Sequence, residues 1–440
     1  MNGREEKVPI FHLETPPKIV IIQVEYSMLH LEVLMNDTVR SLMNAVRTDR
    51  ALSCTRPWTS LEERSLVGDW QVCCFTSTIL GVIHKNQDTE LLTLWNNEAI
   101  TGMRQAFAEG AISRHCPPDC PILIRKREFD PDWIEFYDYD PAEYKGFSQE
   151  FRENRERVLD AIANRQLRVD AFPVRLKLHP SNVCNLDCRM CNLDKHLREE
   201  IGEGWWRNIR QLFPYLEEIV VFGGEPFACR TTREIVFGGE LARHPQIHFS
   251  TITNGAILDE HILERLKGLR LGWFSFSLDS CDPANYPKIR VNAEYSRTFA
   301  NIERFVRARD TGDIRIRKIN ALFVIQALNF REVARFIEWA HGLRIDPVFS
   351  LVTGTPELLG PIGEVRESLD AGIETADRIG MTSAAADLRS LLRELPRYER
   401  KLRRQKQYFR VSEVIDRDRV VSFFQRHNTL KNAVRKIMGI

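Results

Sequence analysis

The most informative segment of the chain reads Val174-Arg-Leu-Lys-Leu-His-Pro-Ser-Asn-Val-Cys184-Asn-Leu-Asp-Cys188-Arg-Met-Cys191. Its first half alternates apolar and basic side chains, which predicts a β-strand that ends at Pro180. Its second half sets three cysteines at the spacing C-x3-C-x2-C. Three soft thiolates on one short loop are typical of iron–sulfur or zinc ligation. The segment therefore predicts a strand whose carboxyl end carries a metal site.

Further strand patterns follow along the chain, with helical patterns between most of them. The expected strands span residues 174–178, 218–222, 247–253, 273–278, 319–325 and 347–352, and the expected helices span residues 205–213, 258–266, 299–308 and 330–339. Strands that alternate with helices form parallel βα units. We therefore expect an α/β fold in which residues 168–355 form a partial (β/α)6 barrel of the TIM type, with its chemistry at the carboxyl ends of the strands.

The ends of the expected strands carry further short motifs. Gly223-Gly224-Glu225-Pro226 follows the second strand, Thr253-Asn254-Gly255 follows the third, Ser277-Leu278-Asp279 ends the fourth, and Arg290 lies beyond it. With the cysteine triplet, these motifs resemble those of the radical S-adenosylmethionine (radical SAM) enzymes over residues 173–352. The resemblance implies a [4Fe–4S] cluster held by Cys184, Cys188 and Cys191, whose open iron binds S-adenosylmethionine.

The resemblance also implies roles for the other motif residues. Gly223, Gly224, Glu225 and Pro226 would receive the methionine amino group of S-adenosylmethionine, Asn254 would belong to the same binding site, and Ser277, Asp279 and Arg290 would reach the ribose and the carboxylate. The family cleaves this cofactor with one electron from the cluster, and the resulting 5′-deoxyadenosyl radical takes a hydrogen atom from the substrate. A protein such as flavodoxin or ferredoxin would donate the electron.

Several of these motifs have plainer explanations. A zinc site could use the cysteine triplet together with His179 or His196. The two glycines at 223–224 could form an ordinary turn between a strand and a helix. Ser277 and Asp279 both suit the N-cap of a helix. The agreement of four motifs, in order and on the expected strands, favours the radical SAM interpretation.

A second cysteine group lies before the expected barrel, within residues 54–120. Its opening has the pattern C-x13-G-x4-C, and Trp95-Asn96, Arg104, Gly110 and a C-x3-C pair follow. This order resembles the SPASM/twitch extension of radical SAM enzymes, and it implies one auxiliary [4Fe–4S] cluster held by Cys54, Cys73, Cys116 and Cys120, with Cys74 as a spare thiol. The segment departs from the family because it precedes the barrel and offers fewer cysteines than the full pattern. A zinc ribbon or a metal-free relic is the alternative.

The remaining segments complete the expected domain organisation. Residues 1–130 would form a small α+β auxiliary domain, in which residues 18–35 suit a pair of strands. Residues 131–167 would form a linker helix capped by Ser148, and residues 356–440 a helical tail. Within the tail, residues 397–410 hold seven Lys or Arg and one acidic residue. A solvated helix face is the usual explanation of such a run, and contact with RNA or with an acidic partner is the alternative.

Composition limits the partners and the location of the protein. The 440 residues include 62 Lys and Arg against 61 Asp and Glu, so no excess charge attracts nucleic acid or an anionic membrane. Residues 1–17 carry charges and prolines where a signal peptide needs an apolar run. No stretch approaches the ~18 apolar residues of a membrane span. We therefore expect a cytoplasmic protein whose cysteines are reduced and available for metal binding or catalysis.

Together the patterns predict a radical SAM enzyme that takes a hydrogen atom from a small molecule and oxidises, epimerises or rearranges it. The expectation of only one auxiliary cluster favours a small molecule over a ribosomal peptide. A peptide maturase is the alternative enzyme, and an iron–sulfur or zinc protein that binds RNA through its basic tail is the alternative from another class. Cys229 and Cys281 lie just beyond two expected strands, where each could return a hydrogen atom to the substrate radical or be a buried inert thiol.

Overall fold

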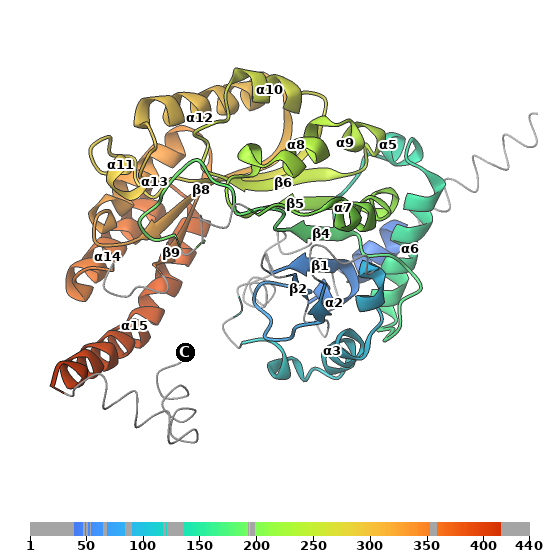
Figure 1. Ribbon diagram of the computed structural model, residues 1–440, viewed down its shortest axis with the longest axis horizontal. Helices are drawn as coiled ribbons and strands as arrows, with labels where there is room; N and C mark the ends of the chain where they lie inside the picture. Colours follow the sequence, from blue (N-terminus) through green and yellow to red (C-terminus); the bar gives the residue numbers. More distant parts are fainter. Residues whose placement is uncertain are drawn as a thin grey trace, which may run out of the picture. The chain divides into compact units, whose positions relative to one another are not determined.

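The structure, a computed structural model, describes residues 39–46, 49, 52, 54–64, 68–83, 90–117, 120, 136–191, 193, 199–352 and 359–414, with the backbone alone for 401–414 (Figure 1). The chain divides into two compact units. The first comprises Met1–Ser60, Phe75–Thr78 and Leu92–Val174, and the second comprises Leu61–Cys74, Ile79–Leu91 and Arg175–Ile440. The segments 61–74 and 79–91, which the sequence suggested were part of an N-terminal domain of residues 1–130, thus group with the expected barrel.

One sheet of nine strands is described, in the order β3-β2-β1-β4-β5-β6-β7-β8-β9. The strands are β1 (Ser60–Glu63), β2 (Asp69–Gln71), β3 (Gly81–Val82), β4 (Arg175–Leu178), β5 (Glu218–Val221), β6 (His248–Thr253), β7 (Arg270–Ser277), β8 (Arg315–Ile325) and β9 (Asp346–Leu351). Every neighbouring pair from β4 to β9 is parallel, whereas β2 is antiparallel to both β1 and β3. The fold is therefore mixed α/β with a mostly parallel sheet, consistent with a partial barrel, and the six expected strands are confirmed.

Helices follow the parallel strands, as Figure 1 shows. They are α7 (Glu203–Arg210), α8 (Arg230–Phe237), α9 (Glu240–Arg243), α10 (Glu260–Leu266), α11 (Tyr286–Ile289), α12 (Tyr295–Asp310) and α13 (Val333–Gly342), with the short 3₁₀ turns η4 (Phe213–Tyr215), η5 (Pro226–Ala228) and η6 (Phe330–Glu332). The four helices expected from the sequence are present. The short helices α8, α9 and α11 and the strands β1–β3 were not expected.

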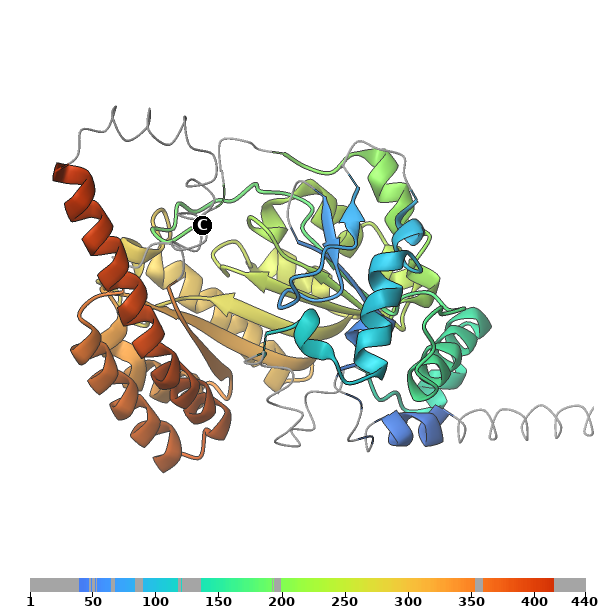
Figure 2. The ribbon, with the colours of Figure 1, turned by 90° about the horizontal axis from the view of Figure 1, so that it is seen from below.

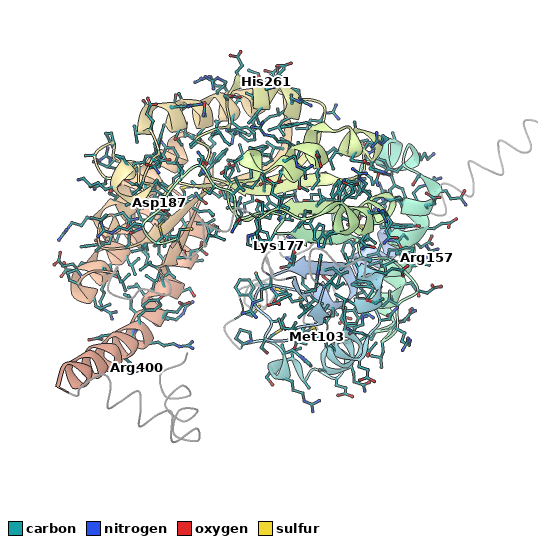
Figure 3. All side chains as sticks on the ribbon, in the orientation of Figure 1. Met103, Arg157, Lys177, Asp187, His261 and Arg400 are labelled. Atoms are coloured by element: carbon teal, nitrogen blue, oxygen red, sulfur yellow. The ribbon has the colours of Figure 1, made fainter. Side chains whose placement is uncertain are left out.

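The two faces of the parallel strands differ, because side chains alternate along a strand. One face is apolar and packs under the helices. Phe274 of β7 lies against Phe305 of α12 with 4.9 Å between ring centroids, and Phe323 of β8 lies 4.6 Å from Phe336 of α13. Burying one such ring contributes roughly 1.5–3 kcal/mol. The opposite face carries half-buried polar residues such as Lys177, which Figure 3 labels on β4.

The amino ends of β4, β5 and β6 meet in a polar cluster. Arg175 pairs with Glu218, which in turn pairs with His248 in the register of the sheet. The Arg175 Nε lies 2.8 Å from a Glu218 carboxylate oxygen, and the Ser250 hydroxyl donates to the other carboxylate oxygen at 2.6 Å. Burial lowers the pKa of His248 to about 4, although the Glu218 charge opposes that shift. His248 is therefore neutral at pH 7.

In the first unit, residues 39–46 are helical, and the helices with described bounds are α2 (Arg56–Thr59), α3 (Glu98–Ala108), α5 (Pro141–Lys145) and α6 (Gln149–Ala163), with the 3₁₀ turn η2 (Ile112–Arg114). A further 3₁₀ turn, η1, spans Leu91–Leu94. Helix α6 is the expected helix within residues 131–167. The Ser148 hydroxyl accepts a hydrogen bond from the Phe151 N–H at 3.2 Å, so the predicted N-cap is also found.

Two long helices follow β9. They are α14 (Ile362–Arg378) and α15 (Thr382–Val414), and they lie within residues 356–440, where the sequence predicts a helical tail. The Tyr398 hydroxyl of α15 donates to the Val352 carbonyl at 2.7 Å, and α15 lies beside β9 (Figure 2). None of the described helices is both long and apolar enough to cross a membrane. The strand pair expected over residues 18–35, His196 and the chain beyond 414 lie outside the described residues.

Candidate functional site

The loop that carries Cys184, Cys188 and Cys191 leaves the carboxyl end of β4 and is held by backbone hydrogen bonds on two sides. On one side, Gly224 N–H donates to Ser181 O at 3.0 Å and Glu225 N–H donates to Val183 O at 2.8 Å. On the other side, the N–H groups of residues 187 and 189 donate to the carbonyls of residues 291 and 289, at 2.9 and 3.0 Å. Figure 3 labels Asp187 on this loop. The loop is thus tied both to the end of β5 and to the segment after α11.

The glycines of the Gly223-Gly224-Glu225-Pro226 motif allow this close approach. Gly223 has φ +126°, and a Cβ there would lie 2.4 Å from the His179 ring. A Cβ at Gly224 would lie 2.0 Å from the Val183 carbonyl oxygen. Neither position can accept a side chain unless the backbone moves. The atoms that a side chain at either position would meet belong to His179 and to the start of the cysteine loop.

Glu225 is buried at the base of the site and binds the end of β6. One carboxylate oxygen accepts hydrogen bonds from the Thr253 hydroxyl at 2.7 Å and the Phe227 N–H at 3.3 Å, and the other accepts from the Asn254 N–H at 2.8 Å. Burial raises the pKa of the Glu225 carboxyl, although these hydrogen bonds and the charge of Arg290 oppose the rise. A carboxylate has about four lone-pair positions, so this one keeps about one position for a ligand.

The Thr253-Asn254-Gly255 turn contacts the cysteine loop directly. The Asn254 side-chain amide donates to the Asn185 amide oxygen at 2.8 Å. Gly255 has φ +73°, a conformation that favours glycine. The Asn301 amide of α12 donates to the Gly255 carbonyl at 3.0 Å. The turn therefore fixes Asn185, which lies between the first two cysteines of the triplet.

Asp279, Arg290 and Cys188 form a buried chain of charged and polar contacts. The Asp279 side chain is 0% exposed, and its carboxylate lies 2.6 Å from the Arg290 Nη2. The Arg290 Nη1 donates to the Cys188 Sγ at 3.4 Å. Burial opposes the charged form of Arg290, but the charges of Asp279 and Cys188 outweigh it and raise the pKa of Arg290. The guanidinium therefore stays charged between a carboxylate and a predicted cluster ligand.

The Arg290 Nε is also buried and has no hydrogen-bond partner in the described protein. Because a buried N–H without an acceptor costs about 1–3 kcal/mol, this group suits an anionic ligand that is added to the site. Asp279 does not cap a helix. Its carboxylate accepts the Val324 N–H at 2.7 Å instead. Ser277, the last residue of β7, is half-buried beside this chain of contacts.

The three thiols suit an iron–sulfur cluster by their chemistry and place. Cys184 and Cys188 are half-buried and Cys191 is exposed. Burial raises the pKa of Cys184, and the charges of Glu225, Cys188 and Cys191 add to the rise, so the thiols lie within electrostatic reach of one another. Among the described residues, no three His, Cys, Asp or Glu side chains are gathered closely enough to hold a single metal ion. Three thiols, one of which accepts a hydrogen bond from a guanidinium, fit the larger, anionic cluster that the resemblance implies.

Cys229 and Cys281, the two expected hydrogen-atom donors, lie at the carboxyl ends of β5 and β7. Cys229 is 2% exposed and precedes α8, and Cys281 is 5% exposed. Burial raises the pKa of both thiols, to about 12 for Cys281, where the Glu332 charge contributes. Both therefore stay protonated, as a hydrogen-atom donor must. Their burial equally suits the inert alternative.

The sequence missed three polar residues that organise the site. Asn185 receives the amide of Asn254, as described above. Asn329 donates to the Asp279 carbonyl at 2.6 Å and to the Val324 carbonyl at 2.9 Å. Glu332 accepts from the Ser280 hydroxyl at 2.6 Å and from the Cys281 N–H at 3.2 Å. No local pattern marks these residues, although Asn329 lies between an expected strand and an expected helix and Glu332 lies in the first turn of that helix.

In the first unit, the Trp95-Asn96 and Arg104 motif has a structural role. Arg104 is 0% exposed and donates to the Pro57, Leu167 and Trp95 carbonyls and to the Asn96 amide oxygen, at 2.8–3.0 Å. All four acceptors are neutral, and burial lowers the pKa of Arg104 to about 9. The motif thus ties residue 57 to residue 167, the segment that leads into β4.

The auxiliary cysteines are distributed over both units. Cys54, Cys116 and Cys120 belong to the first unit, and Cys73 and the exposed Cys74 belong to the second. Burial raises the pKa of Cys116 to about 11, and the charge of Cys120 adds to it, so these two thiols lie near each other. Cys54 accepts the Arg56 N–H at 3.5 Å and is 7% exposed. Within the first unit, two of the expected ligands are therefore neighbours.

Among solved structures, the chain resembles Streptococcus suis SuiB bound to S-adenosylmethionine, with a TM-score of 0.38 and 15% identity over 64% of this chain and 58% of that one. It also resembles native anSMEcpe with bound AdoMet, with a TM-score of 0.38 and 16% identity over 48% of this chain and 63% of that one.

Among curated proteins, the chain is 24% identical over 176 residues to the probable GTP 3′,8-cyclase of Methanocaldococcus jannaschii. The matched region covers 38% of this chain and 55% of that protein. The chain is 29% identical over 137 residues to the probable GTP 3′,8-cyclase of Methanococcus aeolicus, 29% of this chain and 42% of that protein. The chain thus spans about half the length of these relatives. Residues 178–339 match the model of the Radical SAM superfamily. The chain therefore carries a radical SAM superfamily domain in residues 178–339.

Proposed function

We propose that this enzyme reductively cleaves S-adenosylmethionine and takes a hydrogen atom from a small-molecule substrate. The proposal assigns the [4Fe–4S] cluster of the radical SAM domain to Cys184, Cys188 and Cys191. When bound, the reduced cluster would supply one electron to the sulfonium of S-adenosylmethionine. The observation that carries the assignment is the contact of Arg290 with Cys188, because it sets a fixed cation against a thiol of the triplet.

The other motif residues are proposed to hold S-adenosylmethionine. Glu225 would use its remaining lone-pair position for the methionine amino group, and the Arg290 Nε would donate to the carboxylate. The residues that would complete the contact with the cofactor are Gly223, Gly224 and Pro226 on one strand end and Asn254, Ser277 and Asp279 on the others. Cys229 or Cys281 would return a hydrogen atom where the reaction needs one, since both thiols stay protonated.

A small molecule is the proposed substrate for two reasons. The expectation of a single auxiliary cluster favours it, and the curated relatives carry the name GTP 3′,8-cyclase, which denotes a nucleotide substrate in those proteins. GTP is therefore the first compound to test. A cytoplasmic location, with flavodoxin or ferredoxin as electron donor, belongs to the same proposal.

One auxiliary [4Fe–4S] cluster is proposed for Cys54, Cys73, Cys116 and Cys120. Support comes from the burial of Cys54 and from the electrostatic contact of Cys116 with Cys120. Thiolates that bind a cluster replace their protons with metal, so binding would stabilise the folded first unit.

The test compares the parent protein with a variant in which Cys184, Cys188 and Cys191 are changed to Ala. Both are loaded with iron and sulfide without oxygen, reduced with dithionite and supplied with S-adenosylmethionine. The parent should form 5′-deoxyadenosine and the triple variant should form none, because the site would lack its cluster. Cys74→Ala, which removes an exposed thiol outside the triplet, is the control and should match the parent. Formation of 5′-deoxyadenosine by the triple variant would place the active site elsewhere.

A further inference from the structure

Arg290 is built into the cysteine loop by its backbone as well as by its side chain. The carbonyls of Ile289 and Val291, its two chain neighbours, accept hydrogen bonds from the backbone of the loop. The side chain of Arg290 reaches the Cys188 sulfur from the same short segment. Because both attachments come from one segment, the backbone that carries the guanidinium is fixed against the loop that carries the thiol.

Asp279 supports the other side of the guanidinium from an unusual backbone conformation. Its φ is +64°, which L-residues other than glycine rarely adopt and which costs on the order of 1 kcal/mol or more. Two contacts hold it there. The Val324 N–H donates to its carboxylate at 2.7 Å, and the Asn329 amide donates to its carbonyl at 2.6 Å. The end of β8 thus fixes the carboxylate that orients Arg290.

This arrangement has an electrostatic consequence for any group bound to Cys188. An N–H donor that carries a positive charge stabilises the more negative of two charge states, and hydrogen bonds to cluster sulfurs are among the factors that set a cluster's reduction potential. Little water can screen the charge, because the side chains of Arg290 and Asp279 are only 12% and 0% exposed. A fixed Arg290 would therefore make the one-electron reduction of the cluster easier.

We propose that Arg290, oriented by Asp279, is a positioning residue that raises the reduction potential of the barrel cluster through Cys188. The inference rests on the proposed cluster assignment and goes beyond it. It makes Arg290 a part of the electron-transfer step, and not only a contact to S-adenosylmethionine. It also explains why Asp279 is held in a strained backbone conformation, which a contact to the ribose of the cofactor alone would not explain.

The test measures the midpoint potential of the barrel cluster in the full-length protein without S-adenosylmethionine, by a redox titration followed by electron paramagnetic resonance. The Cys116→Ala, Cys120→Ala background removes the signal of any auxiliary cluster. Arg290→Gln should lower the midpoint potential, so that the ratio of reduced to oxidised cluster at a fixed potential falls about tenfold, equal to about 59 mV for one electron. Arg290→Lys keeps the positive charge but lacks the planar guanidinium that contacts both Asp279 and Cys188. The midpoint potential of this variant should therefore also fall, but by less than that of Arg290→Gln.

Arg175 provides the matched control. Its side chain is 13% exposed and its Nε lies 2.8 Å from Glu218, but it is at the amino end of β4, away from the triplet. Arg175→Gln should lower stability without moving the potential. The double variant Asp279→Asn, Arg290→Gln leaves no unpaired buried carboxylate, so it stays testable if Arg290→Gln alone does not fold. It should still have the lower potential.

Two failures can be told apart. If the parent binds no cluster at the triplet, the proposed function itself is wrong. If the parent binds the cluster and cleaves S-adenosylmethionine, but Arg290→Gln and the double variant keep the parent's midpoint potential, the role of Arg290 alone is refuted.

Discussion

The barrel and the first unit each enclose an arginine, and the two are held in opposite ways. Arg290 contacts a carboxylate and a thiol, and these charges raise its pKa. Arg104 has only neutral oxygens as acceptors, and burial lowers its pKa to about 9. A buried cation without a counter-charge gains little electrostatic energy, so Arg104 contributes by joining chain segments. The difference agrees with the chemical role proposed for Arg290, whereas the contacts of Arg104 are structural.

The largest expected effect tests the architectural half of this comparison. Arg104→Met should lower the free energy of unfolding by about 3–5 kcal/mol, because four buried acceptors would lose their donor. Urea denaturation of the cluster-free protein, followed by tryptophan fluorescence, measures the change. Arg157→Met is the control and should stay within about 0.5 kcal/mol, since that side chain is 45% exposed (Figure 3). A loss of S-adenosylmethionine cleavage with unchanged stability would instead give Arg104 a chemical role.

A smaller effect concerns the charges at the amino ends of the barrel strands. The pKa of His248 is lowered to about 4 in the folded protein, so between about pH 6.5 and 4 the unfolded chain binds more protons. Stability should therefore be complete above pH 6.5 and fall as the pH falls toward 4, by up to about 3 kcal/mol. Urea denaturation at pH 7.5 and 5 should show a smaller loss for His248→Gln than for the parent. His261 is exposed, so His261→Gln should lose as much unfolding free energy as the parent between pH 7.5 and 5. An equal loss in the parent and both variants would show that His248 does not cause the pH dependence.

The smallest expected effect separates cofactor binding from metal binding in the barrel. Glu225→Gln keeps the shape of a side chain that accepts three hydrogen bonds but removes its charge. The free energy of binding S-adenosylmethionine should become about 1.5–3 kcal/mol less favourable, and the iron content should stay the same. Equilibrium dialysis and iron analysis measure the two quantities. Unchanged affinity would show that Glu225 only fastens the end of β6.

Much of the barrel could be predicted from the sequence, because its signals are local. Alternating side chains marked the first parallel strand, short apolar runs between helical patterns marked the others, and the C-x3-C-x2-C spacing marked the loop after β4. Strands β1, β2 and β3 could not be found this way, since they have only 4, 3 and 2 residues and show no alternation.

The contacts of the site were harder to predict than its residues. Cys188 and Arg290 are 102 residues apart, and Val324, which fixes Asp279, lies 45 residues from it. Spacing along the chain carries no information on such pairs. The motif at 223–226 was recognised by its residues, but its spacing could not show that a Cβ at Gly223 or Gly224 would meet His179 or Val183.

The iron content of four proteins tests most directly whether the two cysteine groups act as separate sites. The parent, the Cys184, Cys188 and Cys191 triple variant, the Cys116 and Cys120 double variant and their combination are loaded with iron under the same conditions. We expect the triple variant and the double variant each to bind about four irons fewer than the parent, and their combination to show the sum of the two losses. Formation of 5′-deoxyadenosine should be lost only in the proteins in which the triplet is changed. Retention of the parent's iron content and 5′-deoxyadenosine formation by the triple variant would contradict this expectation.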